Sequence, residues 1–166
     1  MKIAALITWL ITAAGGFYLL GTWLARGGVR QQRTGTTRFP APVIFGHFLL
    51  AAAGLVVWII YLVAGSKPLA WAAFVILLPV ALLGFTMFAR WLGVYRSAAG
   101  SSPGAAGSAD GRTAAGRGAT TTAAPATEVA VPAERHLPVA VVTAHGLLAA
   151  TTLVLVLLTA IGVGGS

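Results

Sequence analysis

The sequence predicts an all-α, polytopic membrane protein in which four helices cross the bilayer. Hydrophobic residues make up 58% of the 166 residues and charged residues only 8%, whereas a soluble domain carries about 25% charge. The mean hydropathy is +0.90. The apolar residues are gathered in four stretches, each near the roughly 20 residues that a helix needs to cross a bilayer. This composition excludes an ordinary soluble enzyme, a disordered chain and a coiled coil.

Each apolar stretch is expected to be a helix, because lipid offers no hydrogen-bond partner to the backbone. The stretches run from Ile3 to Ala25, Pro42 to Ala64, Leu69 to Ala89 and Leu137 to Val163. The first could be mistaken for a signal peptide, but it continues past the small residues at 13–16 and ends at Arg26. We therefore expect a retained helix.

The connections predict how the chain is divided. Residues 1–96 hold the first three helices, and 65–68 form a tight turn that makes the second and third helices antiparallel neighbours. Residues 97–134 are rich in Ala, Gly, Ser, Thr and Pro and predict a disordered cytoplasmic linker. Residues 135–166 supply the fourth helix, which packs with the others as one bundle.

The charge pattern predicts an orientation. There are 11 Lys and Arg against 3 Asp and Glu, a net charge of +8, and most of the Arg residues follow the first and third helices. Positive residues beside spans favour the cytoplasmic side and anionic lipid. We expect a bacterial inner membrane, both Arg-bearing loops in the cytoplasm, both termini outside, and the lipid bilayer rather than nucleic acid as partner.

Two pairs of segments suggest that the bundle is two repeated hairpins. T-x-x-A-R ends the first and third helices at 22–26 and 86–90, and H-x-L-L-A-A-x-x-L-V recurs at 47–56 and 145–154. Chance is the alternative, because Leu and Ala are common in such helices. If the repeat is real, its halves are related by an axis along the membrane normal. The glycines at 15, 16, 21 and 146 indicate close helix packing.

His47 and His145 are the ionisable residues well inside the predicted spans, and such residues are functional candidates by default. The absence of Cys excludes thiolate metal sites and covalent haem attachment. One hypothesis is that these two histidines are metal ligands, holding the iron of a single b-type haem as bis-His axial ligands for electron transfer. Small residues one turn later, Ala51 and Ala149, leave room for a macrocycle, and Arg26 and Arg90 would pair with its propionates. The sequence does not reveal an acceptor for the second nitrogen of either imidazole.

This layout resembles the small four-helix membrane cytochromes b of the cytochrome b561 type. The resemblance is architectural and covers the four spans. Proteins of that type carry four haem-ligating histidines for two haems, whereas two are present inside the spans here. The resemblance therefore implies at most one haem, within a membrane redox complex or a homo-oligomer.

Two alternatives remain. In one, each His makes an interhelical hydrogen bond, and the protein is a scaffold or accessory subunit of a larger complex. In the other, the protein is a small transporter or proton relay, with Pro79 breaking the third helix to open a site. No stand-alone catalytic motif is present, so any enzymatic role would be that of a redox component. His136, beside Glu134 and Arg135, is interpreted as an interfacial residue and not a ligand.

Overall fold

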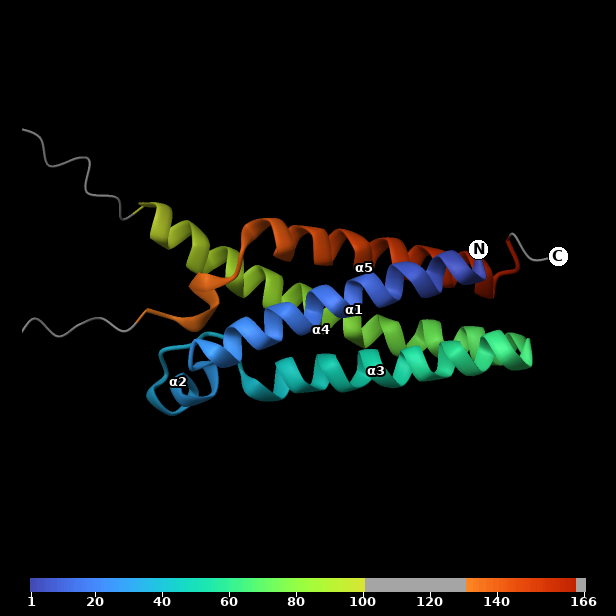
Figure 1. Cartoon of the computed structure of the whole chain (residues 1–166), viewed down its shortest axis with the longest axis horizontal. Helices are drawn as coiled ribbons and strands as arrows, with labels where there is room; N and C mark the ends of the chain where they lie inside the picture. Colours follow the sequence, from blue (N-terminus) through green and yellow to red (C-terminus); the bar gives the residue numbers. More distant parts are fainter. Residues whose placement is uncertain (101–130, 164–166) are drawn as a thin grey trace, which may run out of the picture.

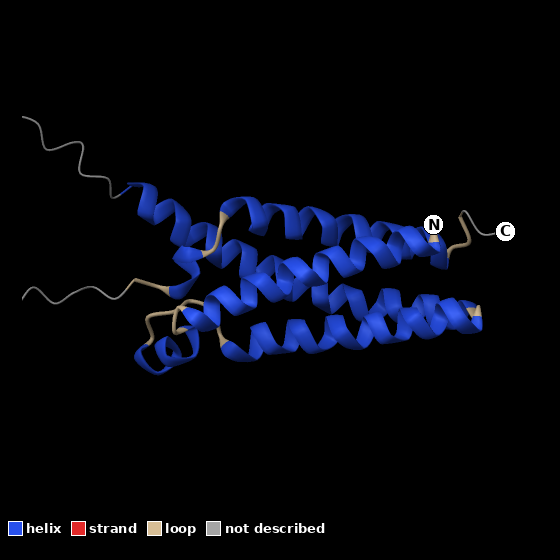
Figure 2. Cartoon of the chain, viewed as in Figure 1, coloured by secondary structure: helices blue, strands red, loops and turns tan. Residues whose placement is uncertain are grey.

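The computed structural model describes residues 1–100 and 131–163, and side chains up to residue 97 and from residue 131. The helices are α1 (Lys2–Ala25), α2 (Gly28–Thr34), α3 (Ala41–Ala64), α4 (Lys67–Gly100), the 3₁₀ helix η1 (Ala133–His136) and α5 (Val139–Ala160). The described residues contain no strand (Figure 2). The all-α prediction is confirmed, and α1, α3, α4 and α5 are long and apolar enough to cross a membrane.

The observed helix ends agree closely with the predicted ones except at the third span. We expected that helix to end at Ala89, but α4 continues to Gly100. Its last turns retain an apolar face, on which Trp91 and Val94 are buried. Pro79 does not break α4. Within the predicted linker, 97–100 belong to α4, 133–136 form η1, and 101–130 lie outside the described residues.

The helices pack in two pairs (Figure 1). α3 lies chiefly against α4 and α1 chiefly against α5; α4 also packs on α5, whereas α1 and α3 share a smaller contact. The α3–α4 turn closes at Gly65, whose φ of 66° is a left-handed conformation that favours glycine. The start of α1 and the end of α5 lie at the end of the bundle that carries this turn, opposite α2 and η1 (Figure 1).

The buried core is divided into two clusters. The terminal cluster lies toward the chain ends and comprises Ala5, Trp9, Trp58, Tyr61, Ala70, Ala73, Leu77, Val80, Val156 and Ala160. The loop-end cluster lies toward α2 and comprises Trp23, Phe39, Ile44, Trp91, Ala133, Leu137 and Val142. Each spanning helix contributes to both clusters, so one layer of the bundle lies between them.

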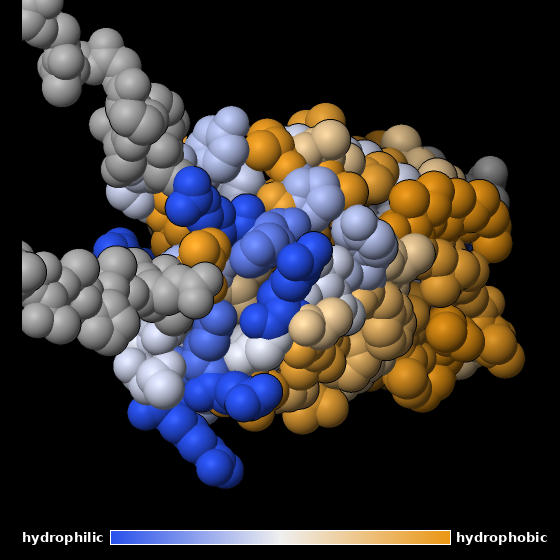
Figure 3. Space-filling view, turned by 60° about the vertical axis from the view of Figure 1, so that its left-hand side comes forward, coloured by the Kyte–Doolittle hydropathy of each residue, from blue (hydrophilic) through white to orange (hydrophobic). Residues whose placement is uncertain are grey.

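The outer surface of the bundle is apolar. Val63, Leu147 and Phe85 are 87%, 72% and 70% exposed, which water would disfavour and lipid tails would accommodate. Figure 3 shows hydrophilic residues gathered toward the α2 end and apolar residues toward the other end. The surface therefore agrees with the composition of a membrane protein.

Candidate functional site

His47 and His145 lie in the layer between the two core clusters. His47 follows Ile44 on α3, and His145 follows Val142 on α5, one turn farther from the loop end in each case. The helices bring the imidazoles together: their ring centroids are 6.4 Å apart and their planes are inclined by 57°. Both side chains are partly buried. Two residues 98 positions apart in the sequence therefore form one pair, well inside the spans as the sequence predicts.

Each imidazole is held by a backbone carbonyl of the helix beside it. The Nδ1 atom of His47 lies 2.9 Å from the carbonyl oxygen of Val80 on α4. The Nδ1 atom of His145 lies 3.0 Å from that of Thr12 on α1. A carbonyl oxygen only accepts, so each Nδ1 donates its proton and each Nε2 retains its lone pair. These acceptors could not be predicted from the sequence, because every residue carries a backbone carbonyl and none is marked as the partner of a histidine.

Glycine allows both rings to approach the neighbouring backbone closely. A Cβ atom added to Gly84 would lie 3.1 Å from Cε1 of His47, and one added to Gly16 would lie 3.1 Å from Cε1 of His145. The Gly15–Gly16 pair, which the sequence analysis assigned to helix packing, therefore accommodates an imidazole. By contrast, a Cβ added to Gly21 or Gly146 would have no atom of another described segment within 4 Å. The prediction of close helix packing at these two glycines is therefore wrong.

The two histidine environments match in detail. On each partner helix the accepting carbonyl stands four residues before the glycine, as Thr12 and Gly16 on α1 and as Val80 and Gly84 on α4. Thr12 and Val80 are 68 positions apart, whereas the T-x-x-A-R segments are 64 positions apart. The two alignments therefore differ by about one helical turn, and the repeat of two hairpins stays a prediction.

Ala51 and Ala149 stand one turn beyond the histidines on the same helices. Ala51 packs against the terminal cluster, and Ala149 is partly buried one turn beyond His145. The glycines of α1 and α4 fill the role of small neighbours, because each imidazole leans across to the adjacent helix rather than along its own. That the alanines leave room for a macrocycle stays a prediction.

The ring separation limits what can join the two histidines. A direct N–H···N bond would bring the ring centroids to about 5 Å. An imidazole nitrogen binds a first-row metal at about 2.0–2.1 Å and lies about 1.1 Å from its ring centre, so one ion held from opposite sides sets the centroids about 6 Å apart. The observed 6.4 Å is too long for the direct bond. It matches the separation for one intervening ion, and it also falls within the roughly 4.5–7 Å of an ordinary contact between rings.

Arg26 and Arg90 lie at the α2 end of the bundle but not together. Arg26 lines a pocket with Gly27, Arg30, Gln31, Thr34 and Thr36, whereas Arg90 lines a separate one with Arg38. Along α4, Arg90 stands about 9 Å from Gly84, and along α1, Arg26 stands about 15 Å from Gly16. Of these two cations, Arg90 is thus nearer to the histidine layer.

A second polar cluster, which the sequence analysis did not identify, holds η1 against the loop before α3. The fully buried Glu134 accepts a hydrogen bond from the backbone N–H of Arg38 at 2.6 Å and from the Thr37 hydroxyl at 2.8 Å. Gln31 of α2 donates to the carbonyl of Val131 and accepts from the N–H of Ala133. Residues 131–134, expected to belong to a linker, are therefore fixed in place.

The fold and the site define a bundle of four membrane-spanning-type helices with a pair of histidines inside it. Within the described residues, no group of three or more His, Cys, Asp or Glu lies close enough to hold a metal ion. Comparison with protein-family models, with curated proteins and with solved structures finds no match to this chain. The geometry of the histidine pair is therefore the feature that bears on function.

Proposed function

We propose that the protein is a membrane electron-transfer component that holds one b-type haem between His47 and His145. The observation that carries this proposal is the 6.4 Å between the two ring centroids, together with Nδ1–H bonds that leave both Nε2 atoms free to coordinate. Ligating histidines usually donate their other ring N–H in this way, which fixes the ring and raises its basicity.

A haem also suits a site with two histidine ligands. A structural zinc ion takes four protein ligands, whereas a haem takes only axial ligands from the protein, because its macrocycle supplies the remaining nitrogens. A haem with two protein axial ligands supplies one-electron transfer. The partners we propose are a quinone or a redox protein of the same membrane, in a complex or a homo-oligomer, with Arg26 and Arg90 as cations for the propionates.

The spectrum of the purified protein tests this proposal. We expect Soret and α bands that sharpen on reduction with dithionite, at about one haem per chain. His47→Leu and His145→Leu should each abolish haem retention. The matched control is His136→Leu, which alters an exposed histidine of η1 and should leave haem content unchanged. Colourless protein from cells supplied with excess haem, or normal haem content in either ligand variant, would overturn the assignment.

A scaffold or accessory role is the second candidate, and the same hydrogen bonds favour it. Each Nδ1–H ties two helices, α3 to α4 and α5 to α1, and such bonds contribute about 0.6 kcal/mol in membranes. His47→Asn separates the two roles, because an amide nitrogen can replace Nδ1 as a donor but supplies no Nε2 ligand. Loss of haem from His47→Asn, with a melting temperature equal to that of the haem-free wild type, supports the haem site. Unchanged haem content supports the packing role.

A further inference from the structure

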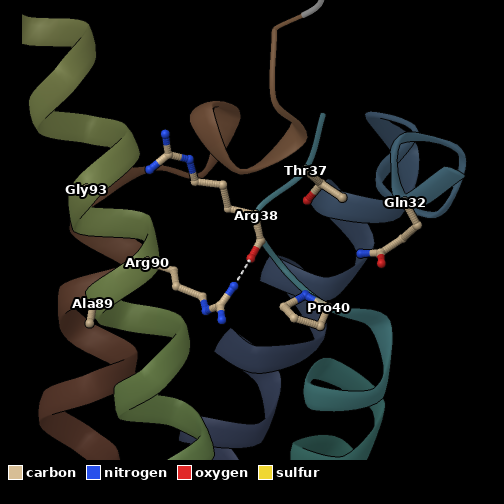
Figure 4. Close-up of a pocket in the computed structure, with 7 residues that line it drawn as sticks. All are labelled: Gln32, Thr37, Arg38, Pro40, Ala89, Arg90 and Gly93. Carbon is tan, nitrogen blue, oxygen red and sulfur yellow. Dashed lines mark hydrogen bonds between the residues drawn. The ribbon is translucent and has the colours of Figure 1, made fainter. Parts of the chain in front are cut away.

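A basic pocket at the α2 end is separate from the histidine pair, although it includes Arg90, one of the two cations proposed above for a propionate. It has a volume of about 360 Å³. Its lining residues are Gln32, Thr37, Arg38, Pro40, Ala89, Arg90 and Gly93 (Figure 4). On α3, Ile44 stands between Pro40 and His47, and on α4, Met87 stands between Gly84 and Arg90; both belong to or pack on the loop-end cluster. The pocket therefore lies nearer the bundle end than Ile44 and Met87, at the level of Phe39 and Trp91 of that cluster.

Two arginine side chains line this pocket beside α4, and their guanidinium groups point to different parts of it (Figure 4). Arg90 donates from Nη1 to the carbonyl oxygen of Arg38 at 2.8 Å (Figure 4). The Nη1 atom of Arg38 lies 4.0 Å from the position that a Cβ on Gly93 would occupy. Ala89 and Gly93 are small, so the space between the two arginines and the helix stays open.

These positive charges have no carboxylate to neutralise them in the described part of the chain. Glu134 is the one acidic residue there, and its two oxygens accept from the Arg38 backbone N–H and the Thr37 hydroxyl. The elements of this end carry seven arginines: Arg26, Arg30, Arg33, Arg38, Arg90, Arg96 and Arg135. Two guanidiniums that line one pocket favour an anion with several acceptor oxygens, and a phosphate is such a group.

We propose that this pocket binds the phosphate of an anionic phospholipid head group. The pocket residues stand at the α2 end of the bundle, toward which the hydrophilic residues gather (Figure 3). The phosphates of a bilayer lie where its apolar core gives way to the polar head groups. Phe85 stands one turn before Ala89 on the same face of α4 and is 70% exposed. It offers an apolar surface along which an acyl chain of the bound lipid can lie.

Lipid binding measured by native mass spectrometry tests the proposal. The intact protein in detergent micelles is titrated with phosphatidylglycerol, phosphatidylcholine or inorganic phosphate. We expect saturable binding of phosphatidylglycerol that is tighter than that of phosphatidylcholine. Arg38→Gln and Arg90→Gln should each weaken it roughly fivefold, as expected for one arginine at a membrane surface. The control, Arg33→Gln, removes the same charge from an exposed residue outside the pocket and should change little.

Each other outcome decides the question. Inorganic phosphate that displaces phosphatidylglycerol at equal molar concentration would assign the pocket to free phosphate and overturn the lipid. Equal losses in all three variants would show a diffuse surface charge and overturn the site. If Arg38→Gln lowers haem content and leaves lipid binding unchanged, the pocket serves a propionate instead. Arg38→Lys keeps the charge, so we expect it to retain part of the lipid affinity. A misfolded variant would lose all of it, and the comparison therefore separates a lost contact from misfolding.

Discussion

At the scale of single residues, the histidine pair is set by what each imidazole can reach. A polar N–H inside a membrane helix needs an acceptor, because lipid provides none. The backbone carbonyls of Thr12 and Val80 serve here, and they are reachable because glycine stands beside each ring. The small residues required for this arrangement are on the neighbouring helices rather than on the helices that carry the histidines.

Enlarging those glycines should destabilise the protein locally. Gly16→Leu and Gly84→Leu would place atoms where the Cε1 edges of His145 and His47 lie. Overpacking of this kind costs about 1–3 kcal/mol, so we expect a lower melting temperature in detergent. Gly146→Leu, at a position with open space around its Cβ, is the matched control and should melt like the wild type. Equal melting temperatures for all three variants would contradict the close approach.

At the scale of elements, η1 joins α5 to the loop before α3. Glu134 is buried, and its carboxylate accepts hydrogen bonds from one N–H and one O–H donor. The side chain of Gln31 adds two hydrogen bonds to the backbone around Ala133. These contacts fix the start of α5, and hence the depth of His145, relative to the helix pair that carries His47.

Removing the Glu134 side chain should release η1. In Glu134→Ala the N–H of Arg38 loses its acceptor, and an unsatisfied buried donor costs about 1–3 kcal/mol. We expect hydrogen exchange of the segment around Thr37 and Arg38 to quicken at least tenfold. Glu134→Gln retains an acceptor oxygen, so its exchange rate should fall between those of the wild type and Glu134→Ala. Unchanged exchange in Glu134→Ala would show that the carboxylate does not hold this segment.

At the scale of the whole molecule, the two ends of the bundle differ in the number of basic residues that they carry. The described arginines stand at the end with α2 and η1, whereas Lys2 and Lys67 stand at the end with the chain termini. The positive-inside rule then favours the α2 end in the cytoplasm. We propose this orientation in a bacterial inner membrane.

Single-cysteine labelling tests the orientation without background, because the chain has no Cys. Ser66→Cys lies in the α3–α4 turn and Thr34→Cys at the end of α2. With a membrane-impermeant maleimide, we expect intact spheroplasts to label Ser66→Cys alone, and lysed cells to label both. The opposite pattern would reverse the topology, and the Cys-free wild type reports non-specific labelling.

The sequence by itself determined the four spanning helices and the turn at Gly65 that makes α3 and α4 antiparallel neighbours. Hydrophobic length and turn composition fix these features locally, so they can be read along the chain. Only the tertiary structure decided that α1 pairs with α5, which carbonyls hold the imidazoles, and that Gly16 and Gly84 adjoin them. It also placed Glu134 in a buried cluster rather than in a linker. Such features arise from contacts between segments far apart in sequence, and a carbonyl or a glycine carries no sign of which side chain will lie against it.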